Sequence, residues 1–132
     1  MISVSVYKQG NYPISADRVK KKLREVLEKR GITSNFSVSV AFVGEKKMEE
    51  LVDKYYKGDP EKEFIHPILT FAASEVYEPF VTPTEESTDL GEIIISYGEA
   101  VKEAKETGKL IEAVVLALVE HGAMHLLGIH HN

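Results

Sequence analysis

Two stretches of this chain have an apolar residue at every second position, and this alternation restricts the possible folds more than any other feature. The stretches are residues 2–6 and residues 36–42. A period of two residues is typical of a strand with one buried face. Two further stretches, 68–73 and 91–96, are short, apolar and bounded by polar residues, which also indicates strands. The sequence therefore predicts a sheet of four strands.

Segments with helical periodicity separate these strands. The first has a candidate N-cap at Ser15 and a glycine at its end, Gly31, and its apolar positions are Val19, Leu23, Val26 and Leu27. Three more helices are expected around Met48–Tyr55, over Tyr97–Glu106 and from about Lys109 onward. We predict an α+β (mixed α/β) fold, in which helices pack on a small mixed four-stranded sheet within one domain covering residues 1–132.

The stretch Ser74–Asp89 carries two prolines and shows no sustained period. A loop of this length inside a compact domain is usually either functional or disordered. We therefore expect an irregular loop here, and the sequence leaves open which of the two it is.

Composition restricts the chemistry of any site. The chain has no cysteine, so a site for a soft metal would have to use imidazole and carboxylate ligands.

The longest apolar run, Ala113–Val119, is far too short to span a bilayer and fits a core helix. The N-terminal alternation is typical of a strand rather than a signal peptide, so we expect a cytoplasmic protein.

The net charge of −5 is unevenly distributed along the chain. Residues 1–62 hold 13 Lys and Arg against 9 Asp and Glu, whereas residues 63–132 hold 3 against 12. The basic residues concentrate on the first predicted helix: Arg18, Lys20, Lys21, Lys22, Arg24, Lys29 and Arg30. This face is a candidate for contacting RNA phosphates, and the alternative is an ordinary solvated surface.

Four histidines lie within the last twelve residues. His121 and His125 are four residues apart on the last predicted helix, in line with Val114 and Leu118, so we expect both imidazoles to point inward from the apolar face. Side chains at this spacing can converge on one zinc ion, with Zn–N distances of ~2.0–2.1 Å.

A third imidazole is within reach only if the helix ends before it. Gly128 can take the left-handed conformation that ends a helix and turns the chain back, which would bring His131 beside the other two. The alternative is two core histidines followed by a polar tail. We favour a metal site, because that alternative does not explain four clustered histidines and a glycine placed between them.

The histidine segment resembles a known signature. Residues 121–131 are similar to H-G-x-x-H-L-x-G-[Y]-D-H of the YbeY family of bacterial rRNA maturation factors, which are zinc-dependent single-strand endoribonucleases. Residues 51–59 resemble that family's L-N-x-x-Y-R-x-x-D segment, 68–71 its V-L-S-F strand and 90–96 its L-G-D-I-x-I-S strand. The resemblance implies a metal helix similar to that of zincins and one Zn²⁺ held by His121, His125 and His131.

The departures from the family pattern identify two further candidate residues. The family's arginine after Tyr55 is replaced by Tyr56, with Lys57 next to it, and Lys57 is our candidate for the basic group that contacts phosphate. His130 stands where the family has aspartate. It is a candidate partner of a metal ligand, a proton shuttle or a substitute ligand. The alternative for Lys57 is a solvated charge at the end of a helix. The alternative for His130 is an exposed histidine near the end of the sequence.

Two function classes follow. The resemblance implies a metal-dependent single-strand endoribonuclease in rRNA maturation and ribosome quality control, and the alternative is a non-catalytic, metal-stabilised ribosome-assembly or interaction protein. The implied partners are single-stranded rRNA and ribosomal particles, with a ribosomal protein or a GTPase as further candidates and no membrane. A metallopeptidase is excluded, because Gly122 occupies the position of the general base in H-E-x-x-H enzymes.

Overall fold

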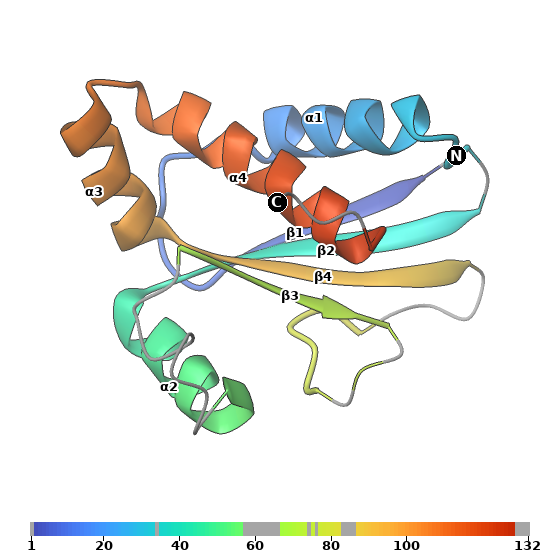
Figure 1. Cartoon of the computed structure of the whole chain (residues 1–132), viewed down its shortest axis with the longest axis horizontal. Coiled ribbons are helices and arrows are strands. Elements are labelled where there is room, and N and C mark those ends of the chain that lie inside the picture. The colour runs from blue at the N-terminus through green and yellow to red at the C-terminus, as the bar shows by residue number, and fades with distance from the viewer. Residues whose placement is uncertain are drawn as a thin grey trace.

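The computed structural model describes residues 2–33, 35–56, 67–73, 75, 77–82 and 87–128, which form a four-stranded sheet with helices on both faces (Figure 1). The strands are β1 (Ser3–Lys8), β2 (Phe36–Val43), β3 (Ile68–Ala72) and β4 (Thr88–Ser96). Their order across the sheet is β1-β2-β4-β3. β1, β2 and β4 are parallel, whereas β3 runs antiparallel to β4. The α+β fold and the mixed sheet predicted from the sequence are confirmed.

Helices cover both faces of this sheet. α1 (Ala16–Lys29), α3 (Tyr97–Thr107) and α4 (Ile111–Leu126) lie on the upper face in Figure 1, and α2 (Glu45–Tyr56) lies below it. α4 lies over β3 and β4 and contacts α1 along one side. Of the helices formed by the described residues, none combines the length and the apolar content needed to cross a membrane.

The alternation of side chains along the strands produces two separate cores. Ile93 and Ile95 of β4 face α1, α3 and α4, while Ile94 between them faces α2. The upper core also takes its side chains from β1 and β2. The lower core is smaller and joins α2 to the sheet through Ala41, Val43, Met48, Leu51, Val52, Leu69, Phe71 and Ile94. The central strands are therefore buried on both sides, as is usual for parallel strands.

The predicted helix ends are also observed. The Oγ atom of Ser15 accepts a hydrogen bond from the Arg18 N–H at 3.2 Å, so Ser15 is the N-cap of α1. Gly31 follows α1 in the left-handed conformation, with φ of 87°. The four predicted apolar positions of α1 are all buried. These features depend on local sequence, which explains why they could be predicted.

The end of the long loop was predicted wrongly. β4 begins at Thr88, whereas the sequence placed residues 74–89 in a loop and started the strand at Gly91. Thr88 pairs with Phe36 of β2, and its N–H donates to the Asn35 carbonyl at 2.9 Å. This pairing joins distant parts of the chain, so the polar composition of residues 87–89 gave no sign of it.

Gly91 lets β3 and α4 come close to β4. Its φ is 130°, and a Cβ atom at this position would lie 2.1 Å from the Phe71 carbonyl oxygen and 3.0 Å from Cδ2 of Leu126. Only glycine combines this conformation with such a close contact. Gly91 therefore fixes the distance between the sheet and the C-terminal end of α4.

The substitution Gly91→Ala should accordingly destabilise the protein by more than about 3 kcal/mol, because it adds both a clash and backbone strain. Gly108→Ala is the matched control, since Gly108 also has a positive φ but a Cβ there would meet nothing within 4 Å. The control should cost only about 1–2 kcal/mol, the strain of an alanine in the left-handed conformation. Urea denaturation measures both variants, and equal losses would contradict the role of close packing at Gly91.

Candidate metal centre

α4 carries the first two predicted ligands close together. The Nε2 atoms of His121 and His125 are 2.8 Å apart, and the two rings are stacked with centroids 4.6 Å apart. One ring donates and the other accepts in this contact, according to their tautomers. The spacing of four residues thus brings two imidazole nitrogens toward one point, as the sequence predicts.

The two imidazoles do not point inward. Both histidines are exposed, whereas Val114 and Leu118 in the first half of the same helix are buried. The residue of this part of α4 that faces the sheet is Gly122, which lies about 100° around the helix from His121. The expectation of inward-facing rings was therefore wrong, because both histidine side chains are exposed to solvent.

Gly122 is required by the packing of α4 on the sheet. A Cβ atom at Gly122 would lie 2.7 Å from Cγ2 of Ile93 and 2.9 Å from Cδ1 of Ile68. A side chain of any size would push α4 away from β3 and β4. The fold thus gives a physical reason why this helix lacks the glutamate of H-E-x-x-H peptidases.

Glu120 is also unavailable as a substitute for that glutamate. Its carboxylate forms an ion pair with Lys22 of α1 at 3.3 Å. It therefore points toward α1 and away from the imidazole pair, as its position one residue before His121 predicts.

The helix ends where the sequence predicts. α4 stops at Leu126, and Gly128 has a φ of 77°, the left-handed conformation. The Gly128 N–H donates to the His125 carbonyl at 3.0 Å, which closes the final turn. His130 and His131 lie outside the described residues, and so does Lys57. Within the described part of the chain no three His, Asp or Glu side chains gather in a way that could hold a metal ion.

Three of the basic side chains on α1 contact neighbouring elements of the fold. Arg18 pairs with Glu112 of α4, Lys22 pairs with Glu120, and the Arg24 Nε donates to the Ile2 carbonyl at 3.1 Å. Lys21, Lys29 and Arg30 are exposed instead. The basic face is thus divided into residues that attach α1 to its neighbours and residues that can meet a partner.

A groove of about 590 Å³ lies between α1 and α4. Lys22, Lys29 and Arg30 line it together with Glu25, Glu28 and Glu120, so its positive and negative charges balance. It lies on the Glu120 side of α4, which is not the side of the imidazole pair. The groove as a whole therefore carries no net charge.

Sequence reasoning missed the contacts that depend on distant residues. Nothing in the sequence indicated that Arg18 and Lys22 pair with α4, or that Glu92 is buried. One signal was available for Gly122, because a glycine inside an apolar helix often marks a close packing contact.

Comparisons with known proteins identify close relatives of this chain. The family model for Endoribonuclease YbeY matches residues 5–132. A protein named Endoribonuclease YbeY from Dehalococcoides mccartyi strain BAV1 is 30% identical over 126 residues, which cover 90% of this chain and 76% of that protein. One of the same name from Thermoanaerobacter strain X514 is 34% identical over 117 residues, covering 86% of this chain and 72% of that protein.

A solved structure is also similar. A Thermotoga maritima protein determined in solution matches with a TM-score of 0.59 and 26% sequence identity, and the match covers 100% of this chain and 75% of that one. The similarity therefore extends over the whole fold, including the sheet below the imidazole pair.

Gly122→Glu, which would restore the peptidase motif, should destabilise the protein by more than about 3 kcal/mol, because the side chain would overpack the interface and bury a charge. Ala117→Glu is the matched control, since Ala117 is exposed on the same helix. It should change the free energy of unfolding by no more than about 0.5 kcal/mol. If urea denaturation gave equal stabilities for the two variants, Gly122 would not be a packing residue.

Proposed function

The chain belongs to the YbeY family of endoribonucleases, and we propose that it cleaves single-stranded rRNA at a centre that holds one zinc ion. Family membership makes the protein a nuclease, which is a hydrolase of phosphodiester bonds. The observation that carries the finer proposal is the convergence of the His121 and His125 Nε2 atoms beside the helix end at Gly128. A role in rRNA maturation and ribosome quality control, in the cytoplasm, is part of this proposal.

The donor set fits zinc. Two imidazoles on one tetrahedral zinc ion, each at ~2.0–2.1 Å, place their nitrogens about 3.3 Å apart. The observed separation of 2.8 Å is a few tenths of an ångström shorter. Because both side chains are exposed, small rotations about their χ angles would open this distance. His131 is our proposed third ligand, because a glycine in the left-handed conformation, as Gly128 is, can turn a chain back at the end of a helix.

The histidines and their surroundings would set how the centre works. A zinc ion held by three imidazoles keeps a coordination position open, where it can lower the pKa of a water molecule and polarise a phosphoryl oxygen. No carboxylate occupies the position of Gly122, so a proton must be taken up by another group. Lys57 and His130 remain our candidates for phosphate contact and proton transfer.

The family comparison bears on the non-catalytic alternative. The relatives carry the name of an endoribonuclease, and the family model matches residues 5–132, which include the histidine segment. This favours the enzyme over a metal-stabilised assembly protein. Ribosomal particles, a ribosomal protein or a GTPase stay as proposed partners in addition to RNA.

For the RNA itself, the exposed basic residues of α1 are the proposed contacts. Lys21, Lys29 and Arg30 form no ion pair with any described residue, whereas Arg18 and Lys22 do. Tyr55 is not available for stacking on bases, because its ring packs edge to face on Phe71 at 5.0 Å and its Oη accepts the Glu78 N–H.

The zinc proposal predicts about one zinc per chain in protein purified without a nickel column. His121→Ala, His125→Ala and His131→Ala should each lose it, whereas His130→Ala should keep it. Glu120→Gln is the control, because Glu120 adjoins His121 in sequence but pairs with Lys22. Metal analysis decides, and loss of zinc in His130→Ala together with retention in His131→Ala would overturn the ligand assignment.

Cleavage of single-stranded rRNA should stop when a chelator is added and should be absent in His125→Ala. Gel analysis of the products measures both effects. Cleavage that survived both treatments would indicate a contaminating nuclease and would remove the support for the catalytic proposal.

Replacing Lys21, Lys29 and Arg30 together by alanine should weaken RNA binding and reduce the slope of log K against log salt by about 2, because each phosphate contact to a single strand contributes ~0.7. Arg18→Ala is the control, since its guanidinium is already paired with Glu112. An unchanged slope in the triple variant would remove α1 from the RNA surface.

A further inference from the structure

A short irregular segment crosses the underside of the sheet. We call residues 77–82 the strap; none of them is in a helix or a strand. Its backbone nevertheless finds partners in the sheet and in α2. The Glu78 N–H donates to the Tyr55 Oη at 3.0 Å, and the N–H groups of Phe80 and Val81 donate to the carboxylate of Glu92 at 3.0 and 3.1 Å.

Glu92 is an unusual residue for the middle of a sheet. It is fully buried in β4, and among the described residues it is the only Asp, Glu, Lys, Arg or His side chain that is buried. A buried carboxylate is tolerated only when hydrogen-bond donors surround it. Here three donors do so: the two strap N–H groups and the Ser39 hydroxyl at 2.7 Å. Glu92 therefore depends on the strap, and the strap depends on Glu92.

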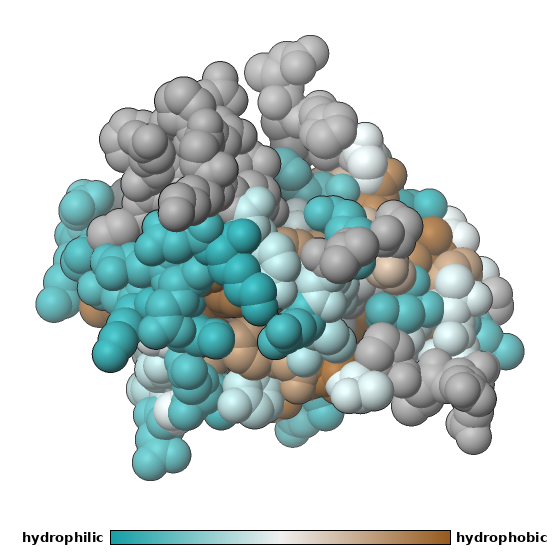
Figure 2. All heavy atoms as spheres, turned by 90° about the horizontal axis from the view of Figure 1, so that it is seen from below, coloured by the Kyte–Doolittle hydropathy of each residue, from teal (hydrophilic) through white to brown (hydrophobic). Residues whose placement is uncertain are grey.

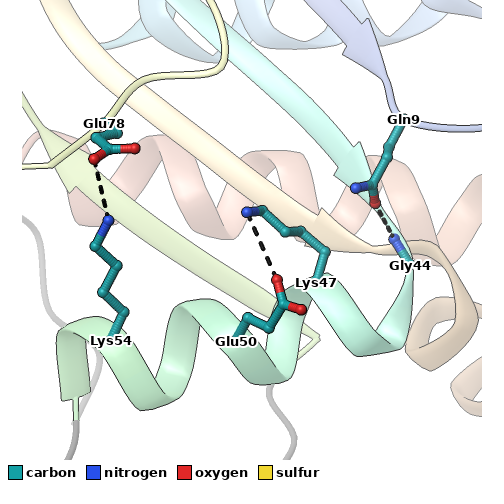
Figure 3. A network of polar contacts seen from close by, with 6 residues as sticks. All are labelled: Gln9, Gly44, Lys47, Glu50, Lys54 and Glu78. Atoms are coloured by element: carbon teal, nitrogen blue, oxygen red, sulfur yellow. Dashed lines mark hydrogen bonds and ion pairs between the residues drawn. The ribbon is translucent and has the colours of Figure 1, made fainter.

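Side-chain contacts hold the rest of the strap. The Tyr77 ring stacks on Phe71 at 4.8 Å, and the Phe80 ring stacks on Tyr7 at 5.4 Å. Burial and the nearby Glu92 carboxylate raise the pKa of the Tyr77 phenol, so this side chain stays neutral. Glu78 also pairs with Lys54 of α2 at 3.2 Å (Figure 3). On this underside, hydrophilic side chains surround a narrow band of apolar ones (Figure 2).

The residues on either side of Glu92 contact α4, the helix that carries His121 and His125. Gly91 lies against Leu126, and Ile93 lies against Gly122, both on the upper face. Because side chains alternate along a strand, Glu92 faces the strap while its two neighbours face α4. Residues 91–93 thus connect the strap to the half of α4 that carries His121 and His125.

We propose that Glu92 is a positioning residue: by binding the strap, it holds residues 91–93 in place beneath α4 and so keeps the His121–His125 pair in the arrangement that binds metal. Glu92 touches neither substrate nor metal and acts through β4. The inference about metal rests on the proposed function, whereas the inference about α4 can be tested without metal.

Hydrogen exchange tests whether Glu92 holds both the strap and the C-terminal half of α4 in place. Glu92→Gln keeps the size of the side chain but leaves one acceptor oxygen for three donors. In this variant the amides of Phe80 and Val81 should exchange faster, and so should those of Ala123–Leu126, while those of Val114–Val119 should stay protected. Glu75→Gln is the matched control, because its carboxylate accepts a hydrogen bond from the Ala72 N–H at 2.9 Å rather than from the backbone of the strap. Uniformly faster exchange, or change in the strap alone, would overturn the proposal.

Val81→Pro is a second variant, in case Glu92→Gln fails to fold. It removes one strap donor and leaves β4 unaltered. The amides of Phe80 and of Ala123–Leu126 should again exchange faster. Chymotrypsin should then cut after Tyr77 before any other site, since the bond after Phe80 precedes the new proline and resists this protease. Cuts distributed over the whole chain would mean global unfolding rather than release of the strap.

Zinc titration tests the functional part. Affinity should fall about 2- to 30-fold in Glu92→Gln, the range expected for a residue that is coupled to a site without touching it, and should be unchanged in Glu75→Gln. Equal affinity in Glu92→Gln and the wild type would overturn the coupling to the metal pair. If the wild type itself bound no zinc, the proposed function would fail, and the exchange data would still decide whether Glu92 positions α4.

Discussion

The close approach of α4 to the sheet is the constraint on which the rest of the structure depends. Gly122 of the helix lies on Ile93 and Ile68, and Gly91 of the sheet lies under Leu126. These two glycines remove side chains from both sides of one interface, so the helix can lie directly on β3 and β4. As a consequence the flank of α4 with His121 and His125 remains outside the core, and the imidazoles are exposed although the helix is buried.

Charged groups in this protein have two distinct uses. Arg18 and Lys22 attach α1 to α4 through Glu112 and Glu120, in exposed pairs that contribute little stability each but fix orientation. Glu92 does the opposite, because it is buried and satisfied mainly by backbone groups of an irregular segment. A count of charges along the sequence treats these residues alike. Only their contacts in the structure distinguish charged side chains that a partner can bind from those that pair within the fold.

Local sequence predicted most of the fold and the ligand-bearing helix. The alternating stretches became strands, Ser15 became an N-cap, and Gly31 and Gly128 took left-handed conformations at helix ends. These outcomes depend on residues a few positions apart. The features that local sequence did not predict depend on residues distant in the chain. Thr88 joins β4 by pairing with Phe36, and Glu92 is buried beneath the strap. The direction of the His121 side chain is set by the packing of Gly122 on the sheet. The positions of Lys57, His130 and His131 lie outside the described residues and stay predictions.

The strand order has a consequence for synthesis on the ribosome. β4 is the strand that joins β3 to the rest of the sheet, yet β3 precedes it in the chain. During translation the apolar segment Ile68–Ala72 therefore emerges from the ribosome before the strand that pairs with it. Until β4 has emerged as well, β3 has no place in the sheet, and an unpaired apolar strand is prone to aggregate. The nascent chain thus exposes an unpaired apolar strand until the segment ending at Ser96 has left the ribosome.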